Sequence, residues 1–296
     1  MIRKTFYIVV MLTILFSTSL LHAQEKLLVA EKSISKTLPF SVQDELKITG
    51  DKADIVMSGW DKNFIQVKIT LSAKHSDKQV AEKELGYMKY SLTKENNQIE
   101  VMNTFVIPDQ VARLQSRMTV LFEIKIPANA KVYFQNKYCT IRLSDLTANA
   151  NMQLQFGHVE LNRVSGKLAI ENHFGEVQGS DINAQLTCKT DKSFINLQEL
   201  KGNCTFYTTL GSIDLSLHET LQALTIKSSH TPVVLSTRNT DAFQYDLHTT
   251  YASVFVPDAY QKYLKTTGPH ANAFVMGTSK KLIKVNTTYS SIHFKN

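Results

Sequence analysis

The fold is decided by residues 132–217, which in lines of 18 residues read VYFQNKYCTIRLSDLTAN, ANMQLQFGHVELNRVSGK, LAIENHFGEVQGSDINAQ, LTCKTDKSFINLQELKGN and CTFYTTLGSIDLSL. One aliphatic anchor recurs in each line, and the anchors are Ile141, Val159, Val177, Ile195 and Ile213. Apolar residues also recur nine positions before each anchor (Val132, Ala150, Leu168, Leu186 and Cys204) and seven positions before it (Phe134, Met152, Ile170, Cys188 and Phe206). A fixed period near 20 residues indicates a solenoid, in which each repeat buries its apolar face against its neighbours.

The columns around the anchor predict two or three short strands and a turn in every repeat. The anchor and the residue two positions beyond it alternate with polar residues, which is the period of a half-buried strand. Positions nine, seven and five before the anchor give a second alternating strand. A small residue two positions before the anchor marks a turn, where a side chain would crowd the next coil and where glycine tolerates positive φ. This small column is Cys139, Gly157, Gly175, Ser193 and Gly211, and a further apolar column at a corner is Leu146, Val164, Ile182 and Leu200.

The pattern therefore predicts an all-β, single-stranded β-helix whose coils have about 18–21 residues. A left-handed hexapeptide helix would need an aliphatic residue at every sixth position, which this sequence lacks, so we expect a right-handed helix. The period loosens after Leu217: Val233 follows Ile213 by 20 residues, and Val254 follows by another 21. Ile292 comes 38 residues after Val254, which predicts two coils with one degenerate copy between them.

The first residues read as a secretory signal peptide. Arg3 and Lys4 precede an apolar run, and Leu21-His22-Ala23 gives a cleavage site, so the predicted peptide is residues 1–23. An uncleaved anchor is the alternative, but the run is short for a bilayer span of about 20 residues. We expect an extracytoplasmic protein (periplasmic, at the outer surface or secreted) with no membrane span after cleavage.

The next segment predicts a cap on the solenoid. Leu46, Ile48, Ala53, Ile55 and Met57 match the repeat columns, so residues 24–128 should hold a first coil and a β-rich N-terminal cap. In this cap we expect strands around residues 65–71, 99–101 and 122–126 and one helix over Asp77–Tyr90. Residues 129–296 form the β-solenoid, either by themselves or as one continuous domain with residues 40–128.

Charge and cysteine content exclude two classes of partner or scaffold. Without Arg3 and Lys4 the chain has 31 basic and 26 acidic residues, and the charges are scattered, so we expect no nucleic-acid partner. Three cysteines exclude a disulfide-dense scaffold. Cys188 and Cys204 fall in inward columns as small hydrophobes, and both are expected to stay free.

No pattern of polar residues predicts a catalytic, cofactor or metal site. His173, Asp191 and Thr209 share one outward column, but the carboxylate lies between the other two groups, so the histidine cannot reach the hydroxyl. Glu160 and Asp214 are three coils apart, about 14 Å at the ladder spacing, which exceeds the ~5–9.5 Å between glycosidase carboxylates. The nine histidines show no HxH or HExxH spacing. Opposite charges on adjacent coils, Arg142 with Glu160 and Glu171 with Lys189, are interpreted as surface ladder pairs.

The N-terminal half carries a resemblance to a known family. Its motifs are Gly50-Asp51-Lys52-Ala53-Asp54-Ile55, Gly59-Trp60-Asp61 and Ile126-Pro127, followed by tandem strand-Gly-x-Val/Ile coils. Over roughly residues 40–296 the chain resembles the bacterial "putative adhesin" domain family of unknown function, common in secreted Bacteroidetes proteins. The resemblance implies an adhesin-like role and assigns no site residues. The chain departs from the glycine turn at Lys192-Ser193-Phe194 and at Thr231-Pro232-Val233.

Three functions from different classes follow from this reading. The first is an exported, non-catalytic binding module that recognises a protein or glycan at the cell surface. The second is a structural or regulatory envelope protein that binds a protein partner of the same cell. The third, a carbohydrate-active β-helix enzyme, would need converging carboxylates in a pocket. We expect the first, and we expect no enzymatic activity.

The register of the repeat can be tested in its core. We predict that Ile195→Asp unfolds the array, because it places an uncompensated charge in the apolar interior. Arg142→Ala is the control and should change the free energy of unfolding by no more than about 0.5 kcal/mol. Thermal melting and far-UV circular dichroism check both variants, and an unchanged melting temperature for Ile195→Asp would contradict the register.

Overall fold

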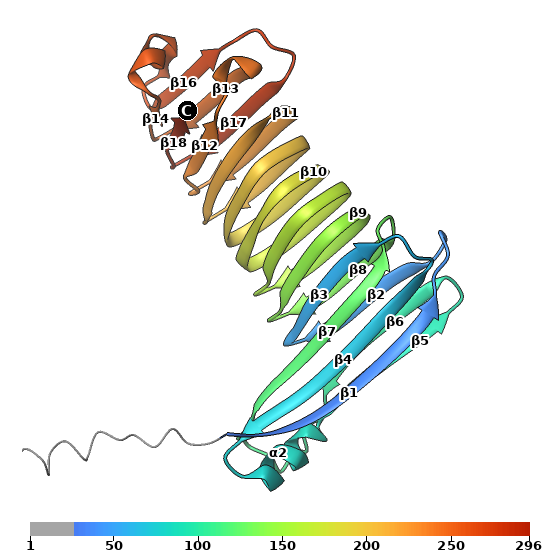
Figure 1. The fold of residues 1–296 in the computed structure, drawn as a ribbon. Coiled ribbons are helices and arrows are strands. Elements are labelled where there is room, and N and C mark those ends of the chain that lie inside the picture. Colours follow the sequence, from blue (N-terminus) through green and yellow to red (C-terminus); the bar gives the residue numbers. More distant parts are fainter. Residues whose placement is uncertain (1–26) are drawn as a thin grey trace, which may run out of the picture.

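The computed structural model describes residues 27–296, so the predicted signal peptide lies outside the described residues. The described strands join in one curled sheet, and Figure 1 shows the strands from β9 to β18 stacked as coils beside a block of long strands that carries the helix α2. The fold is all-β and solenoid-like, as predicted. The right-handed, single-stranded path of the helix and the domain division near residue 128 stay predictions.

The strands account for most of the described chain. Their bounds are β1 (Leu28–Pro39), β2 (Glu45–Asp51), β3 (Ala53–Trp60), β4 (Phe64–His75), β5 (Met88–Glu95), β6 (Gln98–Phe105), β7 (Arg117–Pro127), β8 (Lys131–Lys137), β9 (Thr140–Gln155), β10 (His158–Thr209), β11 (Ser212–Ser229), β12 (Val233–Thr237), β13 (Gln244–Thr250), β14 (Val254–Phe255), β15 (Leu264–Gly268), β16 (Ala271–Met276), β17 (Leu282–Thr288) and β18 (Ile292–Lys295). The helical elements are α2 (Lys78–Leu85) and the 3-10 turns η2 (Thr240–Ala242) and η3 (Asp258–Tyr263). β9, β10 and β11 are long because their pairing continues around the corners of successive coils.

Parallel pairing places like residues of successive coils side by side. Ile141 of β9 pairs with Val159 of β10, and Ile195 of β10 pairs with Ile213 of β11. All five anchors are buried, as are the columns seven and nine positions before them and the column five positions after. Burying one such side chain contributes about 1.5–3 kcal/mol relative to leaving it exposed. The interior is thus a set of aliphatic ladders that run along the solenoid axis.

The turn before each anchor brings the backbones of successive coils close together. Gly157, Gly175 and Gly211 do not have positive φ; the residue before each of them does. A Cβ added to Gly211 would lie 2.0 Å from the backbone oxygen of Ser193 on the preceding coil. Of the two reasons proposed for the small column, crowding by the next coil is therefore confirmed, and positive φ at these glycines does not occur.

Nine of the left-handed non-glycine residues form a column of their own, here called the corner ladder. They have φ between 49° and 60° and are Lys52, Tyr138, Phe156, Phe174, Lys192, Leu210, His230, Tyr251 and Tyr289. Their aromatic rings stack: the ring centroids of Tyr138 and Phe156 are 4.7 Å apart, and those of Tyr251 and Tyr289 are 4.9 Å apart. A left-handed backbone costs a non-glycine residue roughly 1–2 kcal/mol, and each aromatic pair returns about 0.5–1.5 kcal/mol. Stacking thus offsets much of the strain of the turn.

Buried polar side chains complete the turns from inside. Asn172 donates from Nδ2 to the backbone oxygen of Gly157 (2.9 Å) and accepts from its backbone N–H (3.3 Å). The hydroxyl of Ser193 donates to the backbone oxygen of Asp191 (3.0 Å). At Thr231 the hydroxyl donates in the same way to the oxygen of Ser229 (2.9 Å). The two places where the sequence lacks a glycine turn therefore keep the same left-handed corner, closed by a hydroxyl.

The last coil of the chain is not where the sequence placed it. Ile292 of β18 pairs with Val233 of β12 on one side and with Val254 of β14 on the other. The predicted degenerate coil between Val254 and Ile292 is wrong, because residues 282–295 fit between two earlier coils. The intervening residues form η3 and the antiparallel strands β15 and β16, which extend the sheet beyond β13.

The N-terminal end has the same kind of insertion. β2 pairs in parallel with both β6 and β8, and β3 pairs with both β7 and β9. The residues in which the sequence predicts a first coil thus lie beside the main array, paired in parallel with β8 and β9. Outside it, β4 pairs antiparallel with β7, and β1 pairs antiparallel with β4.

The predicted helix is present but shorter than Asp77–Tyr90. Asp77 caps α2 by accepting the backbone N–H of Gln79 at 2.7 Å, and the helix ends before Gly86. Met88, expected on the helix, instead begins β5, where its side chain is buried. Glu84 is buried and accepts backbone N–H groups of Gln115 and Ser116. These bonds hold the end of the loop before β7 against the helix.

Close approach between coils gives a direct test. We predict that Gly211→Val destabilises the protein by about 1–3 kcal/mol, because its Cβ must displace the backbone of Ser193. Gly268→Ala is the control, since its Cβ would meet only the Cβ of Ala271 at 3.7 Å and should cost less than about 0.5 kcal/mol. Urea unfolding of both variants measures the difference. Equal stabilities would show that the small column has another cause.

Candidate binding groove

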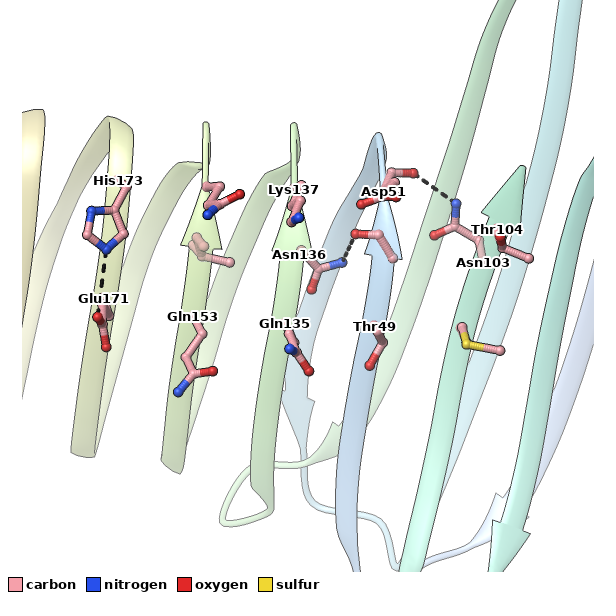
Figure 2. Close-up of a pocket in the computed structure, with 14 residues that line it drawn as sticks. Thr49, Asp51, Asn103, Thr104, Gln135, Asn136, Lys137, Gln153, Glu171 and His173 are labelled. Atoms are coloured by element: carbon pink, nitrogen blue, oxygen red, sulfur yellow. Dashed lines mark hydrogen bonds and ion pairs between the residues drawn. The ribbon is translucent and has the colours of Figure 1, made fainter. Parts of the chain in front are cut away.

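Outward side chains on neighbouring strands line a long groove on one face of the solenoid. One part, about 540 Å³ in volume, crosses β6, β2, β8, β9 and the start of β10 (Figure 2). A second part of about 460 Å³ continues over later turns of β10 and onto β11, and the two parts share Glu171 and His173. We call the two parts together the polar groove. Its outward side chains include Thr49, Asp51, Thr104, Gln135, Lys137, Gln153, Gln155, Glu171, His173, Lys189, Asp191, Tyr207, Thr209, Lys227 and Ser229.

The strand register explains why these side chains form rows. Gln135 of β8 pairs with Gln153 of β9, and Lys137 pairs with Gln155. Each coil thus adds the same two outward positions, six and four before the anchor, at the ladder spacing of about 4.8 Å. Figure 2 shows the resulting row from Thr49 through Gln135 and Gln153 to Glu171.

Three oxygens at one end of the polar groove lack a donor. Asn136 donates from Nδ2 to the backbone oxygen of Gly50 (3.3 Å), and Asn103 donates to that of Asp51 (2.9 Å). The Oδ1 atoms of both side chains and Oγ1 of Thr49 are buried and have no hydrogen-bond partner among the described residues. Leaving a buried acceptor unpaired costs about 1–3 kcal/mol, and folded proteins rarely do so. These three oxygens lie beneath the surface of the groove and are closed off from a ligand.

The charges of the polar groove balance. Three carboxylates, those of Asp51, Glu171 and Asp191, and three ammonium groups, those of Lys137, Lys189 and Lys227, line it. The predicted ladder pair of Glu171 with Lys189 does not occur among the ion pairs of the described chain. Glu171 instead approaches His173 of its own strand, at 3.7 Å from Nε2. The other predicted pair, Arg142 with Glu160, is confirmed at 2.9 Å.

The neighbouring outer face carries a denser network. Around Arg142, Glu160 and Asn196 it forms a shallow hollow of about 530 Å³. His158 lies between two carboxylates, with Nε2 3.0 Å from Glu160 and Nδ1 3.1 Å from Glu176. Because the two ring nitrogens of His158 contact different carboxylates, the imidazole and the two carboxylates do not converge on one point. Across residues 27–296 no cluster of three or more His, Cys, Asp or Glu side chains is arranged to hold a metal ion.

The sequence-derived catalytic candidates remain apart. His173, Asp191 and Thr209 all line the polar groove, but the ion-pair partner of His173 is Glu171 on the same coil. The absence of enzymatic activity stays a prediction.

Sequence reasoning missed two features of this surface. The aromatic members of the corner ladder, Tyr138, Phe156 and Phe174, recur at the interval of the anchors and could have been found as a further column. Phe194 could not have been found that way, because its column otherwise holds polar residues such as His158 and Glu176. Its side chain is 62% exposed.

With this geometry established, the chain can be compared with known proteins. A family model described as Toastrack DUF4097 matches residues 43–293. The chain belongs to this family. The resemblance inferred from Gly50–Ile55 and the tandem coils is thereby confirmed, and this Toastrack chain matches the model over nearly all of its described length. No curated protein matches its sequence.

Solved structures with a likeness to the Toastrack chain are remote. A "putative lipid binding protein" from Parabacteroides distasonis is 13% identical, with a TM-score of 0.39 over 90% of this chain and 97% of its own. A "putative adhesin" from Bacteroides fragilis is 9% identical, with a TM-score of 0.32 over 89% and 97%. A "putative cell adhesion protein" from Clostridium sporogenes is 12% identical, with a TM-score of 0.28 over 90% and 99%. At these values none of them carries an argument about what the Toastrack chain binds.

All three cysteines of the Toastrack chain are free and buried, as predicted for Cys188 and Cys204. Burial raises the pKa of the thiols of Cys139, Cys188 and Cys204 to about 12. A thiol with so high a pKa holds almost no thiolate at neutral pH, and the thiolate is the nucleophile. No cysteine therefore serves as a reactive group on the surface.

We predict that the native protein shows no thiol reactive toward Ellman's reagent at pH 8, and that three thiols react after unfolding without reductant. Fewer than three thiols after unfolding would reveal a disulfide. A peptide map that joined Cys188 to Cys204 would contradict the register of β10.

Proposed function

We propose that this protein is an exported, non-catalytic, adhesin-like binding protein that presents the outer ladders of a right-handed, single-stranded β-helix to a ligand at the cell surface. The polar groove is the observation that carries the proposal. It combines a concave shape with rows of amides and hydroxyls and with equal numbers of carboxylates and lysines.

The rigidity of the groove supports a binding role. Its side chains stand on parallel strands that pair on both sides, rather than on loops. Groups held in place before binding lose little conformational entropy when a ligand arrives, so a larger share of the contact energy appears as affinity. A ladder surface is thus suited to recognition without movement.

Export rests on the signal peptide predicted for residues 1–23. Within residues 27–296, the helices are all too short or too polar to cross a bilayer. We place the mature chain outside the cytoplasm, in the periplasm, at the outer surface or in the medium.

A protein partner of the same cell is the second candidate function, and the exposed apolar side chains favour it. Phe194 is 62% exposed, and it lies beside Phe156, Phe174 and Lys192 in a shallow depression of about 390 Å³. Exposed aromatic side chains of this kind act as anchors in protein interfaces. A structural or regulatory envelope protein would use this face rather than the polar groove.

The two candidates separate in one binding experiment. The purified mature chain is assayed on a glycan array and on intact cells, beside the double variant Gln135→Ala/Gln155→Ala in the polar groove and the single variant Phe194→Ala. We expect the groove variant to lose at least tenfold in binding and Phe194→Ala to keep it within twofold. Asn196→Ala/Gln198→Ala, two exposed amides on the other face, is the matched control. Loss confined to Phe194→Ala would favour the protein partner, and binding to neither cells nor array would contradict the adhesin-like role.

A further inference from the structure

The side chains of the polar groove repeat at the spacing of the coils, and a ligand that fits the groove must have a similar repeat. The groove runs across the strands, along the solenoid axis, from β6 to β11. Figure 2 shows its first part, which ends at Glu171 and His173. Building on the proposed function, we infer that it binds a linear, uncharged polysaccharide whose sugar residues follow the successive coils.

The spacing of the rows favours a sugar chain over a peptide. Outward amides such as Gln135 and Gln153 recur at the ladder spacing of about 4.8 Å. An extended peptide presents side chains on one face every second residue, about 6.6–6.8 Å apart, and falls out of step after one coil. A pyranose ring with its glycosidic bond spans a length close to one coil, so a linear glycan stays in register over many of them.

The chemistry of the rows favours hydroxyl groups. Each amide of Gln135, Gln153 and Gln155 offers both donors and an acceptor, and a sugar hydroxyl likewise donates and accepts. Lipid chains have no groups that could pair with these amides.

The balance of charge favours an uncharged chain. A polyanion binds by neutralising its charges with Lys and Arg and releasing counterions, which needs an excess of positive groups. In the polar groove each of the lysines Lys137, Lys189 and Lys227 is matched by a carboxylate. The excess of basic residues that remains without Arg3 and Lys4, 31 against 26, lies outside the groove.

The aromatic corner ladder does not compete for the sugar. Its rings cover one another's faces, as in the pairs Tyr138–Phe156 and Phe156–Phe174, so mainly ring edges meet the solvent. A sugar packs its C–H face on an open ring face. Tyr207 is the aromatic side chain that lines the polar groove, with Lys227 Nζ 6.0 Å from its ring centroid.

The length of the groove sets the length of the ligand. From Thr104 on β6 to Ser229 on β11 the lining crosses eight strand passes, which at about 4.8 Å for each of the steps between them spans roughly 34 Å. Affinity should therefore rise with each added sugar residue and level off near seven residues. A site for a chain end or a single sugar would show no such rise.

Isothermal titration of the mature chain with neutral oligosaccharides tests the inference. The probes are cello-, xylo- and manno-oligosaccharides of increasing length, the neutral polysaccharide purified from the envelope of the producing cell, and heparin as the anionic control. We expect at least one neutral series to bind, with a tenfold or greater gain from the disaccharide to the heptasaccharide and less than a twofold change between 50 and 500 mM salt. Preference for the envelope polysaccharide would assign the ligand to the same cell, and preference for the other glycans to a foreign surface.

Variants locate the site. Gln135→Ala/Gln155→Ala should weaken the longest oligosaccharide at least tenfold, and Asn196→Ala/Gln198→Ala should change it less than twofold. Stronger binding of heparin with steep salt dependence, or loss in the Asn196→Ala/Gln198→Ala variant alone, would overturn the inference. If the chain binds cells or a protein but no neutral glycan, the inference fails and the proposed function stands. If it binds nothing, both fail.

Discussion

Contact between the backbones of successive coils is the constraint on which the rest of this structure depends. At Gly211 the neighbouring carbonyl of Ser193 leaves no room for an unadjusted Cβ. The turn can come so close only because the residue before it, Leu210 in this coil, takes the left-handed conformation and carries the chain around the corner. Small residues, left-handed corners and buried Asn or Ser side chains thus together allow the backbones of two coils to come into contact. They recur along the chain because each coil makes the same contact with the next.

The same closeness gives the outer surface its character. Parallel strands in register repeat every outward side chain along the axis, so a single favourable position becomes a row. On the corner the row is a stack of rings that stabilises the turn, and over the polar groove it is a set of amides and hydroxyls open to a ligand. One coil contributes only a few polar side chains, and the repetition of coils extends them into a surface.

Features of the fold and the groove that follow from the interval between repeats could be predicted from the sequence, and features that depend on which strands become neighbours could not. The anchors, the inward columns and the first coil follow from an interval that one can count along the chain. The polar groove was partly predicted, because its outward columns were identified, but the unused oxygens of Asn103 and Asn136 were not. Asn103 lies outside the regular repeat, and it reaches the groove only because β6 pairs with β2. The insertion of β17 and β18 between earlier coils was missed for a different reason. The repeat predicts which residues of two coils pair, but it does not predict which two coils lie next to each other. Left-handed tyrosines and phenylalanines were missed because backbone preference favours glycine or asparagine at such corners.

The inserted coil at residues 282–295 also changes how the molecule would respond to tension. In a stack built in chain order, a terminal coil has one neighbour and peels away first when its end is pulled. Here β17 is paired with β11 and β13, and β18 with β12 and β14, so a load on this end must shear two ladders at once. The first coil is clamped in the same way between β6–β7 and β8–β9. In a protein that holds one surface to another, an applied force would therefore act on strands that are paired on both sides.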